Sequence, residues 1–212
     1  MNKNLLIIIL LSIFAFNNLN TRNYNFNTAL DRKVKRFLKN HYWRNMNIPV
    51  VDGQKLFDII IKNGYKNAVE IGTSTGHSAI WIAWAMSKTK GRLITIEINR
   101  YRYKKAVENF RKAGLLKYID ARLANAHYLV PRLRGRFDFV FSDADKSWYK
   151  KYFIALDPKL KPGACYVSHN VSLSGDFWNS RPYIKYLLSR KNYKTTFFTK
   201  GSGMSISYKK SR

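Results

Sequence analysis

The pattern of apolar and polar residues changes along the chain. Residues 29–43 (ALDRKVKRFLKNHYW) and 53–64 (GQKLFDIIIKNG) place apolar side chains at the spacing of amphipathic helices. From residue 67 onward, short apolar runs typical of strands alternate with stretches typical of helices. Strands that alternate with helices pair in parallel through right-handed crossovers. The pattern therefore predicts an α/β fold with a doubly wound sheet covered on both faces.

The alternating region supplies the individual elements. Its predicted strands are NAVEIG (67–72), GRLITIEI (91–98), YIDARLA (118–124), RFDFVFSD (136–143) and GACYVSHN (163–170). Its predicted helices are HSAIWIAWAMSK (77–88), RYKKAVENFRKAG (102–114), YLVPRL (128–133), SWYKKYFIAL (147–156) and RPYIKYLLSR (181–190). The tail, YKTTFFTK and MSISYKK around GSG, predicts an antiparallel hairpin. Together these elements predict a mostly parallel, seven-stranded sheet that ends in a hairpin.

The start of the chain carries a different signal. Residues 5–16 (LLIIILLSIFAF) are apolar and uncharged, and as a helix they extend about 18 Å, short of the roughly 30 Å of hydrocarbon in a bilayer. This length fits the apolar part of a signal peptide or a shallow membrane anchor. We divide the chain into a leader (1–20), a linker with an N-terminal helix (21–45) and a main domain (46–212). Basic residues follow the apolar run in excess, which favours a cytoplasmic-facing, membrane-associated protein, with an exported form as the alternative.

The charge balance indicates attraction to polyanions. Lysine and arginine number 39 against 12 acidic residues, for a formal net charge of +27. Nucleic acid and an anionic membrane surface both fit this excess, because the basic residues are spread along the whole chain. The single cysteine, Cys165, excludes an internal disulfide.

Candidate ligand-binding residues follow the first two strands of the alternating region. In EIGTSTGHS (70–78), Gly72 and Gly76 permit a tight strand-to-helix turn, and the opening amides of the next helix, with Ser78, can hold a carboxylate. The loop lacks the G-x-G-x-x-G of dinucleotide sites, which disfavours a dehydrogenase. Glu97 ends the second strand, where a carboxylate can accept hydrogen bonds from a ribose diol. The two features together indicate an adenosine-type ligand.

A second polar group follows the strand RFDFVF. In FSDADKSWYKKYF (141–153), Asp143 comes directly after the apolar run and is expected at the ligand edge of the sheet. Asp145 or Ser142 could instead cap the helix that starts near Lys146, and the lysine could be a solvated surface residue.

These motifs, in this order, resemble one enzyme family. The stretches EIGTSTGHSAIWIA, ITIEINR, ENFRKAGL, FDFVFSDADKSWYKKYF, LKPGACYVSHNV and GSGMSISYKK, with MNIPVVDGQ upstream, are similar to the cation-dependent O-methyltransferases of the catechol and caffeoyl-CoA type. The resemblance runs from about Met46 to the C-terminus. It implies a class I, Rossmann-like methyltransferase domain that uses S-adenosylmethionine (SAM) and a divalent cation, Mg²⁺ by resemblance.

The resemblance also implies roles for individual residues. Lys146 matches the general base of the family. The residues that would bind the methyl donor are Met46, Asn47, Glu70, Gly72, Ser74, Gly76, Ser78, Glu97, Asn125 and Asp143. The residues that would bind the metal are Asp143, His169 and Asn170.

The chain departs from the family pattern at a metal-binding position. His169 stands where an aspartate usually precedes the metal-binding asparagine, and imidazole suits zinc, iron or nickel better than magnesium. Either a softer metal is used, or metal binding and activity are reduced. Asn125 likewise stands where an acid is common. His77 and His127 are interpreted as a loop-packing residue and a helix-start residue.

The leading functional hypothesis is methyl transfer to a hydroxyl of a small phenolic or catechol-like acceptor by a homodimer. Two alternatives remain open. The net charge of +27 would also suit an RNA methyltransferase, although the sequence contains no recognised RNA-binding module. The domain could also be a non-catalytic module that binds the donor or an anionic membrane.

Overall fold

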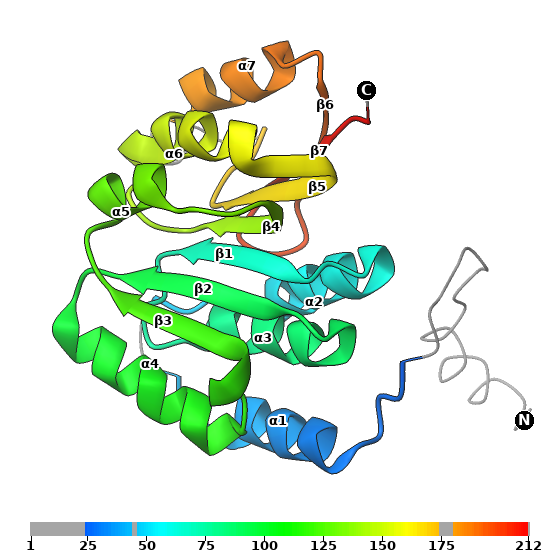
Figure 1. The fold of residues 1–212 in the computed structure, drawn as a ribbon, viewed down its shortest axis with the longest axis vertical. Coiled ribbons are helices and arrows are strands. Elements are labelled where there is room, and N and C mark those ends of the chain that lie inside the picture. The colour runs from blue at the N-terminus through cyan, green and yellow to red at the C-terminus, as the bar shows by residue number, and fades with distance from the viewer. Residues whose placement is uncertain (1–23, 44–45, 174–179, 212) are drawn as a thin grey trace, which may run out of the picture.

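The computed structural model describes residues 24–43, 46–173 and 180–211, which form one sheet with helices on both faces (Figure 1). The strand order is β3-β2-β1-β4-β5-β7-β6, and the first five strands are parallel, while β7 runs antiparallel to both β5 and β6. The predicted doubly wound sheet with a C-terminal hairpin is thus confirmed. The strands are β1 (Asn67–Ile71), β2 (Arg92–Glu97), β3 (Ile119–Leu123), β4 (Phe137–Ser142), β5 (Leu160–His169), β6 (Tyr193–Phe198) and β7 (Met204–Lys209).

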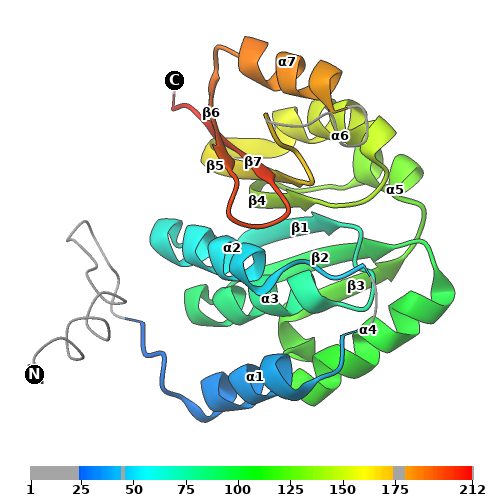
Figure 2. The same ribbon diagram turned by 180° about the vertical axis from the view of Figure 1, so that it is seen from behind.

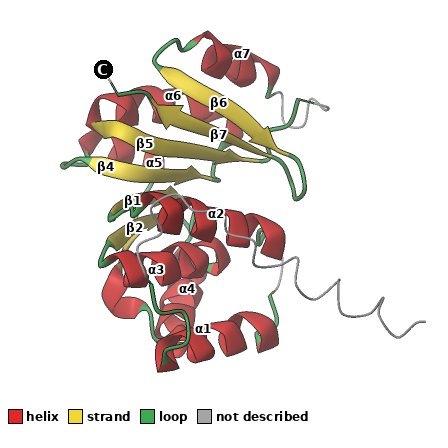
Figure 3. Ribbon diagram, turned by 90° about the vertical axis from the view of Figure 1, so that its right-hand side faces the viewer, coloured by secondary structure: helices red, strands yellow, loops and turns green. Residues whose placement is uncertain are grey.

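The helices divide between the two faces of the sheet. Helices α1 to α4 cover one face and α5 to α7 the other, as Figures 2 and 3 show. The α-helices are α1 (Ala29–Asn40), α2 (Val50–Asn63), α3 (His77–Thr89), α4 (Arg100–Ala113), α5 (Ala126–Arg132), α6 (Tyr149–Leu156) and α7 (Arg181–Ser189). Three single turns of 3₁₀ helix complete the described elements: η1 (Leu116–Tyr118), η2 (Lys146–Trp148) and η3 (Asp157–Lys159).

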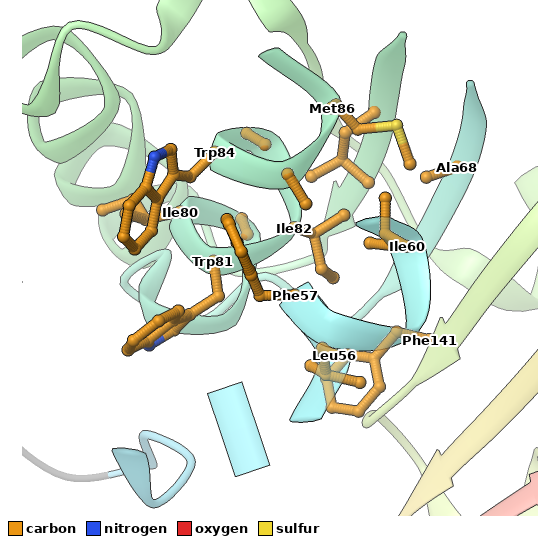
Figure 4. Close-up of a cluster of buried hydrophobic side chains, with 14 of the residues drawn as sticks. Leu56, Phe57, Ile60, Ala68, Ile80, Trp81, Ile82, Trp84, Met86 and Phe141 are labelled. Carbon is orange, nitrogen blue, oxygen red and sulfur yellow. The ribbon is translucent and has the colours of Figure 1, made fainter. Parts of the chain in front are cut away.

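The apolar runs of the sequence mark elements that are buried on more than one side. All six residues of β4 are buried, with Phe139 and Phe141 in the core under α1 to α4 and Val140 in the core under α5 to α7. Helix α3 is buried almost all round because it packs against α2, α1 and β2. Figure 4 shows the aromatic part of this core, where the rings of Phe57 and Trp84 have centroids 4.6 Å apart.

Helix α1 is fastened to the rest of the domain by a buried acid. Thr28 caps the helix in a capping box with Asp31. The Asp31 carboxylate also accepts a hydrogen bond from Trp84 Nε1 at 2.6 Å and lies 2.6 Å from Lys88 Nζ. The helix predicted within residues 21–45 therefore packs directly on α3.

Two boundaries differ from the prediction. Helix α2 begins at Val50, three residues before the predicted start, because Pro49 occupies its N-cap position. Strand β5 begins at Leu160 and runs through Pro162, and its pairing with β4 shifts register between Phe137 and Phe139. A proline is tolerated at such an irregularity, where the ladder does not need its missing N–H.

The predicted leader (1–20) lies outside the described residues, as do residues 21–23 and 44–45 of the predicted linker segment. Within residues 24–43, 46–173 and 180–211, no helix is long and apolar enough to cross a membrane. The division of the chain at residues 20 and 45 stays a prediction.

Candidate active site

The carboxyl ends of β1, β2, β4 and β5 meet around one cavity of about 890 Å³. Two of the predicted site residues, Glu70 and Gly76, do not line it. The other predicted residues line its wall: Met46, Asn47, Gly72, Ser74, Ser78, Glu97, Asn125, Asp143, Lys146, His169 and Asn170. The structure thus brings together in one place residues that lie up to about 120 positions apart in the sequence.

The glycine loop, residues 72–76, requires glycine at two positions because of their left-handed backbone conformation and their close neighbours. Gly72 has a φ of +97°, and a Cβ there would lie 2.4 Å from the carbonyl oxygen of Asp143. Gly76 has a φ of +95° and is the N-cap of α3; a Cβ there would lie 2.5 Å from the ring of Phe110. Gly72 therefore lets the loop pass against the end of β4, whereas Gly76 permits helix packing beneath the loop.

Glu97 is held in place by backbone hydrogen bonds at the end of β2. One carboxylate oxygen accepts the backbone N–H of Ser74 at 2.7 Å, and the other accepts that of Asn99 at 2.8 Å. The side chain is buried but lines the cavity, and each carboxylate oxygen has further acceptor capacity. Asn125 lines the same wall and caps α5 through the N–H of His127 at 2.8 Å.

Glu70 is fully buried at the end region of β1. It accepts a hydrogen bond from Thr95 Oγ1 at 2.5 Å, while its Oε1 has no hydrogen-bond partner within the described residues. Burial raises the pKa of Glu70 to about 8, and the neighbouring hydroxyl groups of Ser78 and Thr95 only partly oppose this. Glu70 is therefore largely protonated at neutral pH.

Lys146 and Asp143 form an ion pair at the opposite side of the cavity. Lys146 Nζ donates to Asp143 Oδ1 at 2.6 Å and to Tyr149 Oη at 2.7 Å. Tyr149 in turn donates to the carbonyl oxygen of His169 at 3.1 Å. These contacts fix the amino group between β4, α6 and β5, at the wall of the cavity.

Asp145 takes the capping role that the sequence offered as one of two alternatives. Its carboxylate accepts the N–H of Ser147 at 3.0 Å at the start of η2. It also lines the cavity and lies 3.3 Å from His127 Nε2. Asp145 therefore both caps η2 and borders the cavity.

His169 lies between two carboxylates. Its Nε2 is 3.0 Å from Asp52 Oδ2, and its Nδ1 is 3.2 Å from Asp143 Oδ2. Burial lowers the pKa of His169, but the two carboxylates outweigh it and raise the pKa to about 9. Burial alone would raise the pKa of Asp143. The contacts with His169 and Lys146 outweigh burial and hold the pKa of Asp143 below its usual range. The Nδ1 contact is close but badly angled, so that Nδ1 has no hydrogen-bond partner within the described part of the chain.

Asp52 is the residue of this cluster that the sequence did not reveal. It lies in the first turn of α2, is fully buried, and accepts the N–H of Ser202 at 3.0 Å. In the sequence, Asp52 is visible only as an acid that precedes the apolar run of a predicted helix. One sequence cannot show that this acid faces His169, 117 residues further along the chain.

Asn170 follows β5 directly and has a left-handed φ of +55°. Asparagine tolerates this conformation better than most residues other than glycine. The turn places Asn170 in the cavity wall next to His169.

Two further histidines line the cavity, and both also pack against aromatic rings. His127 stacks on Trp148 with ring centroids 3.7 Å apart, and His77 lies 4.4 Å from the ring of Trp43. Burial lowers the pKa of His77 to about 4, which leaves it neutral. The packing interpretation of His77 and the helix-start interpretation of His127 are confirmed. The sequence did not indicate that they border the cavity.

Comparisons with known proteins identify relatives of the chain. The family model described as O-methyltransferase matches residues 22–186. A catechol O-methyltransferase of Niastella koreensis is 39% identical over 114 residues, which cover 52% of this chain and 51% of that protein. A caffeoyl-CoA O-methyltransferase of Zinnia elegans is 29% identical over 171 residues, which cover 73% of this chain and 67% of that protein. The matched region thus spans about half of the first relative and about two thirds of the second.

A solved structure shares the architecture. The O-methyltransferase TomG from Streptomyces achromogenes, crystallised in complex with SAM, superposes with a TM-score of 0.73. Its sequence is 24% identical, and the match covers 89% of this chain and 92% of that one. The two proteins have the same fold.

Proposed function

Because the chain belongs to the O-methyltransferase family, we propose that it transfers a methyl group from SAM to a hydroxyl of a small phenolic or catechol-like acceptor. The family predicted from the sequence motifs is confirmed. The observation that carries the proposal is that one cavity has Glu97 and the glycine loop on one side and the Asp143–Lys146 pair on the other.

The donor half of the cavity suits an adenosyl sulfonium ligand. Glu97 presents a carboxylate that two backbone amides already orient, so it can accept hydrogen bonds from a ribose diol without reorganising. The start of α3, with Ser78 in the wall, offers free amide N–H groups to the carboxylate of the methionine part. Asn125 and Met46 complete this side, and their contacts with the donor stay predictions.

The acceptor half suits removal of a proton from a hydroxyl. Methyl transfer needs the acceptor oxygen in line with the sulfonium methyl, and the oxygen must lose its proton on the way. Lys146 Nζ lies at the cavity wall, oriented by Asp143 and Tyr149, and in its neutral amine form it would accept that proton. Tyr149 also connects the lysine to the backbone of His169, so the amino group has few other orientations.

The three residues predicted to hold a divalent cation line the cavity, but within residues 24–43, 46–173 and 180–211 no three His, Cys, Asp or Glu side chains gather as a metal-binding group. Both nitrogens of His169 and both carboxylate oxygens of Asp143 already face ion-pair partners. The described residues therefore do not fit a metal ion at this site, and metal assistance stays a prediction from the sequence.

The acceptor class comes from the relatives, whose names specify catechol and caffeoyl-CoA. The ring of Tyr152 in the cavity wall suits a planar phenolic acceptor. Attachment to an anionic membrane, homodimer formation, a cytoplasmic-facing location and RNA as substrate stay predictions.

The direct test replaces Lys146 by alanine and measures methylation of a panel of catechols and phenols with SAM. We expect kcat to fall roughly 10²-fold to 10⁴-fold. Affinity for S-adenosylhomocysteine, measured by calorimetry, should stay the same. Lys150→Ala, on the exposed side of α6, is the matched control and should leave kcat unchanged. Unchanged methylation by Lys146→Ala would refute the base assignment. Donor binding by the parent protein without methylation of any acceptor would favour the non-catalytic alternative.

A further inference from the structure

We propose that the outer side of α1, with the neighbouring ends of α4 and η1, is a docking surface for an anionic phospholipid bilayer. This surface, the basic face, consists of eight exposed basic residues: Arg32, Lys33, Lys35, Arg36 and Lys39 of α1, Arg111 and Lys112 of α4, and Lys117 of η1. The inference does not depend on the proposed function, because none of these residues lines the cavity.

The first argument is that α1 has two sides of opposite character. Its apolar side, which includes the fully buried Val34, packs against the core under α1 to α4. Its only acid, Asp31, is also fully buried. Arg32, Arg36 and Lys39 lie on the opposite side of the helix, at the i, i+4, i+7 spacing of one helix face. The exposed side of α1 therefore presents positive charge with no acid to balance it.

The second argument is that neighbouring elements extend this charge. A Cβ at Gly114, the C-cap residue of α4, would lie 3.3 Å from the side chain of Lys33, so the end of α4 lies against α1. Burial and the charge of Lys112 lower the pKa of His41, the C-cap residue of α1. Within the described residues, no member of the basic face forms an ion pair with an acid. Positive charges this close repel one another, and an anionic surface offsets the repulsion.

The third argument concerns the kind of anionic partner. The apolar, uncharged residues 5–16 precede α1 in the sequence, and residues 17–28 connect the two. An extended chain spans at most about 3.6 Å per residue, so α1 stays within about 45 Å of the apolar run. A single short apolar anchor binds membranes marginally and reversibly, and stable attachment usually adds a second signal such as a polybasic patch. The two features together favour a lipid surface over nucleic acid, which would not use the apolar run.

The basic face lies away from the other charged end of the molecule. Helix α1 is at one end of the long axis and α7 is at the other (Figure 1), and Figure 3 likewise shows α1 as the outermost helix at its end. Exposed lysines also surround α7, so the net charge of +27 by itself does not single out α1. The two ends therefore allow a comparison in which the charge removed is equal and only its place differs.

The test measures binding of the full chain to lipid vesicles by flotation. One set of vesicles is phosphatidylcholine alone, and the other contains about 30% of the anionic lipid phosphatidylglycerol. The ratio of the two partition coefficients isolates the electrostatic part, because the apolar residues 5–16 meet both kinds of vesicle. We expect a preference for the anionic vesicles of at least roughly 10-fold at about 0.1 M NaCl. The preference should vanish at about 1 M NaCl, where the Debye length falls from about 10 Å to about 3 Å.

Two variants of equal charge assign the preference to one surface. The combination Arg32→Gln, Arg36→Gln and Lys39→Gln removes three charges from the basic face and should lower the preference at least roughly 5-fold. The matched control removes three exposed lysines around α7 and the start of β6, by Lys185→Gln, Lys191→Gln and Lys194→Gln. It should change the preference less than about 2-fold, because charges beyond a Debye length are screened. Thermal unfolding checks that both variants fold, and glutamine is a good helix former.

Three results would overturn the inference. Equal losses in the two variants would mean that binding follows the net charge of the whole molecule. A preference that persists at high salt would mean that the contact is not electrostatic. Equal binding of the parent to both kinds of vesicle, with binding of a short single-stranded RNA that the α1 variant loses, would make the basic face a nucleic-acid surface. Methylation should be the same in both variants and the parent, because none of the six replaced residues lines the cavity.

Discussion

Two buried carboxylic acids of this protein, Asp31 and Glu70, have opposite properties. Both are fully shielded from solvent. Burial alone would raise both pKa values, yet contacts with Lys88, Thr28 and Trp84 lower the pKa of Asp31 to about 2, whereas that of Glu70 rises to about 8. Every carboxylate oxygen of Asp31 has a partner, whereas one oxygen of Glu70 has no hydrogen-bond partner among the described residues.

The difference separates an acid whose partners all belong to the domain core from an acid buried near the carboxyl edge of the sheet. Asp31 finds its partners within the domain, because it completes the capping box of α1 with Thr28 and contacts α3 through Trp84 and Lys88.

Within the described residues, five of the eleven buried side-chain polar atoms without a hydrogen-bond partner belong to Asp52, Glu70, Ser74, His77 and His169, and Ser74, His77 and His169 line the cavity. Such atoms cost free energy in the folded chain unless something else satisfies them. A bound ligand could satisfy those that line the cavity.

The largest expected effect on stability is at Asp31. Asp31→Ala leaves the nearly buried Lys88 without its carboxylate partner and removes the Asp31 half of the capping box, so the free energy of unfolding should fall by about 3 kcal/mol. Urea denaturation measures this. Donor affinity of the folded fraction should be unchanged, because Asp31 does not line the cavity. A loss below about 0.5 kcal/mol would contradict the structural role, since surface substitutions cost that little.

Glu97 should show the reverse pattern, with the effect in binding. Glu97→Ala removes the carboxylate proposed to receive the ribose hydroxyls, and hydrogen bonds to a charged group contribute about 1.5 to 3 kcal/mol. Affinity for S-adenosylhomocysteine should therefore fall at least roughly 10-fold, as measured by calorimetry. Glu108→Ala, an exposed acid on α4, serves as the control. Equal donor affinity in the Glu97 variant and the parent would show that the donor lies elsewhere.

The smallest predicted effect, counted per pH unit, is a pH dependence of stability from Glu70. The unfolded chain releases this proton near pH 4.5 and the folded chain near pH 8, so the folded state binds more protons between these values. Stability should therefore fall as the pH rises through this window, by roughly 1 kcal/mol per pH unit. Glu70→Gln should flatten the decline, as unfolding free energies at several pH values would show. An unaltered slope in the variant would mean that Glu70 ionises normally.

The sequence predicted the sheet and most of the cavity wall because both follow from local patterns. Alternation of strands and helices sets the topology, and residues such as Glu97 and Asp143 come just after predicted strands, where parallel strands bring ligand residues together. Asp52 escaped prediction because its importance depends on a contact across 117 residues. The sequence motif assigned Glu70 to the donor site. In the structure Glu70 does not line the cavity, because its side chain is enclosed within the fold.

The most direct test of the account is a crystal structure of the protein with S-adenosylhomocysteine. We predict the ribose hydroxyls within hydrogen-bonding distance of Glu97 and the sulfur at the end of the cavity bordered by Asp143 and Lys146. Density for the ligand outside this cavity, or a ribose with no contact to Glu97, would contradict it.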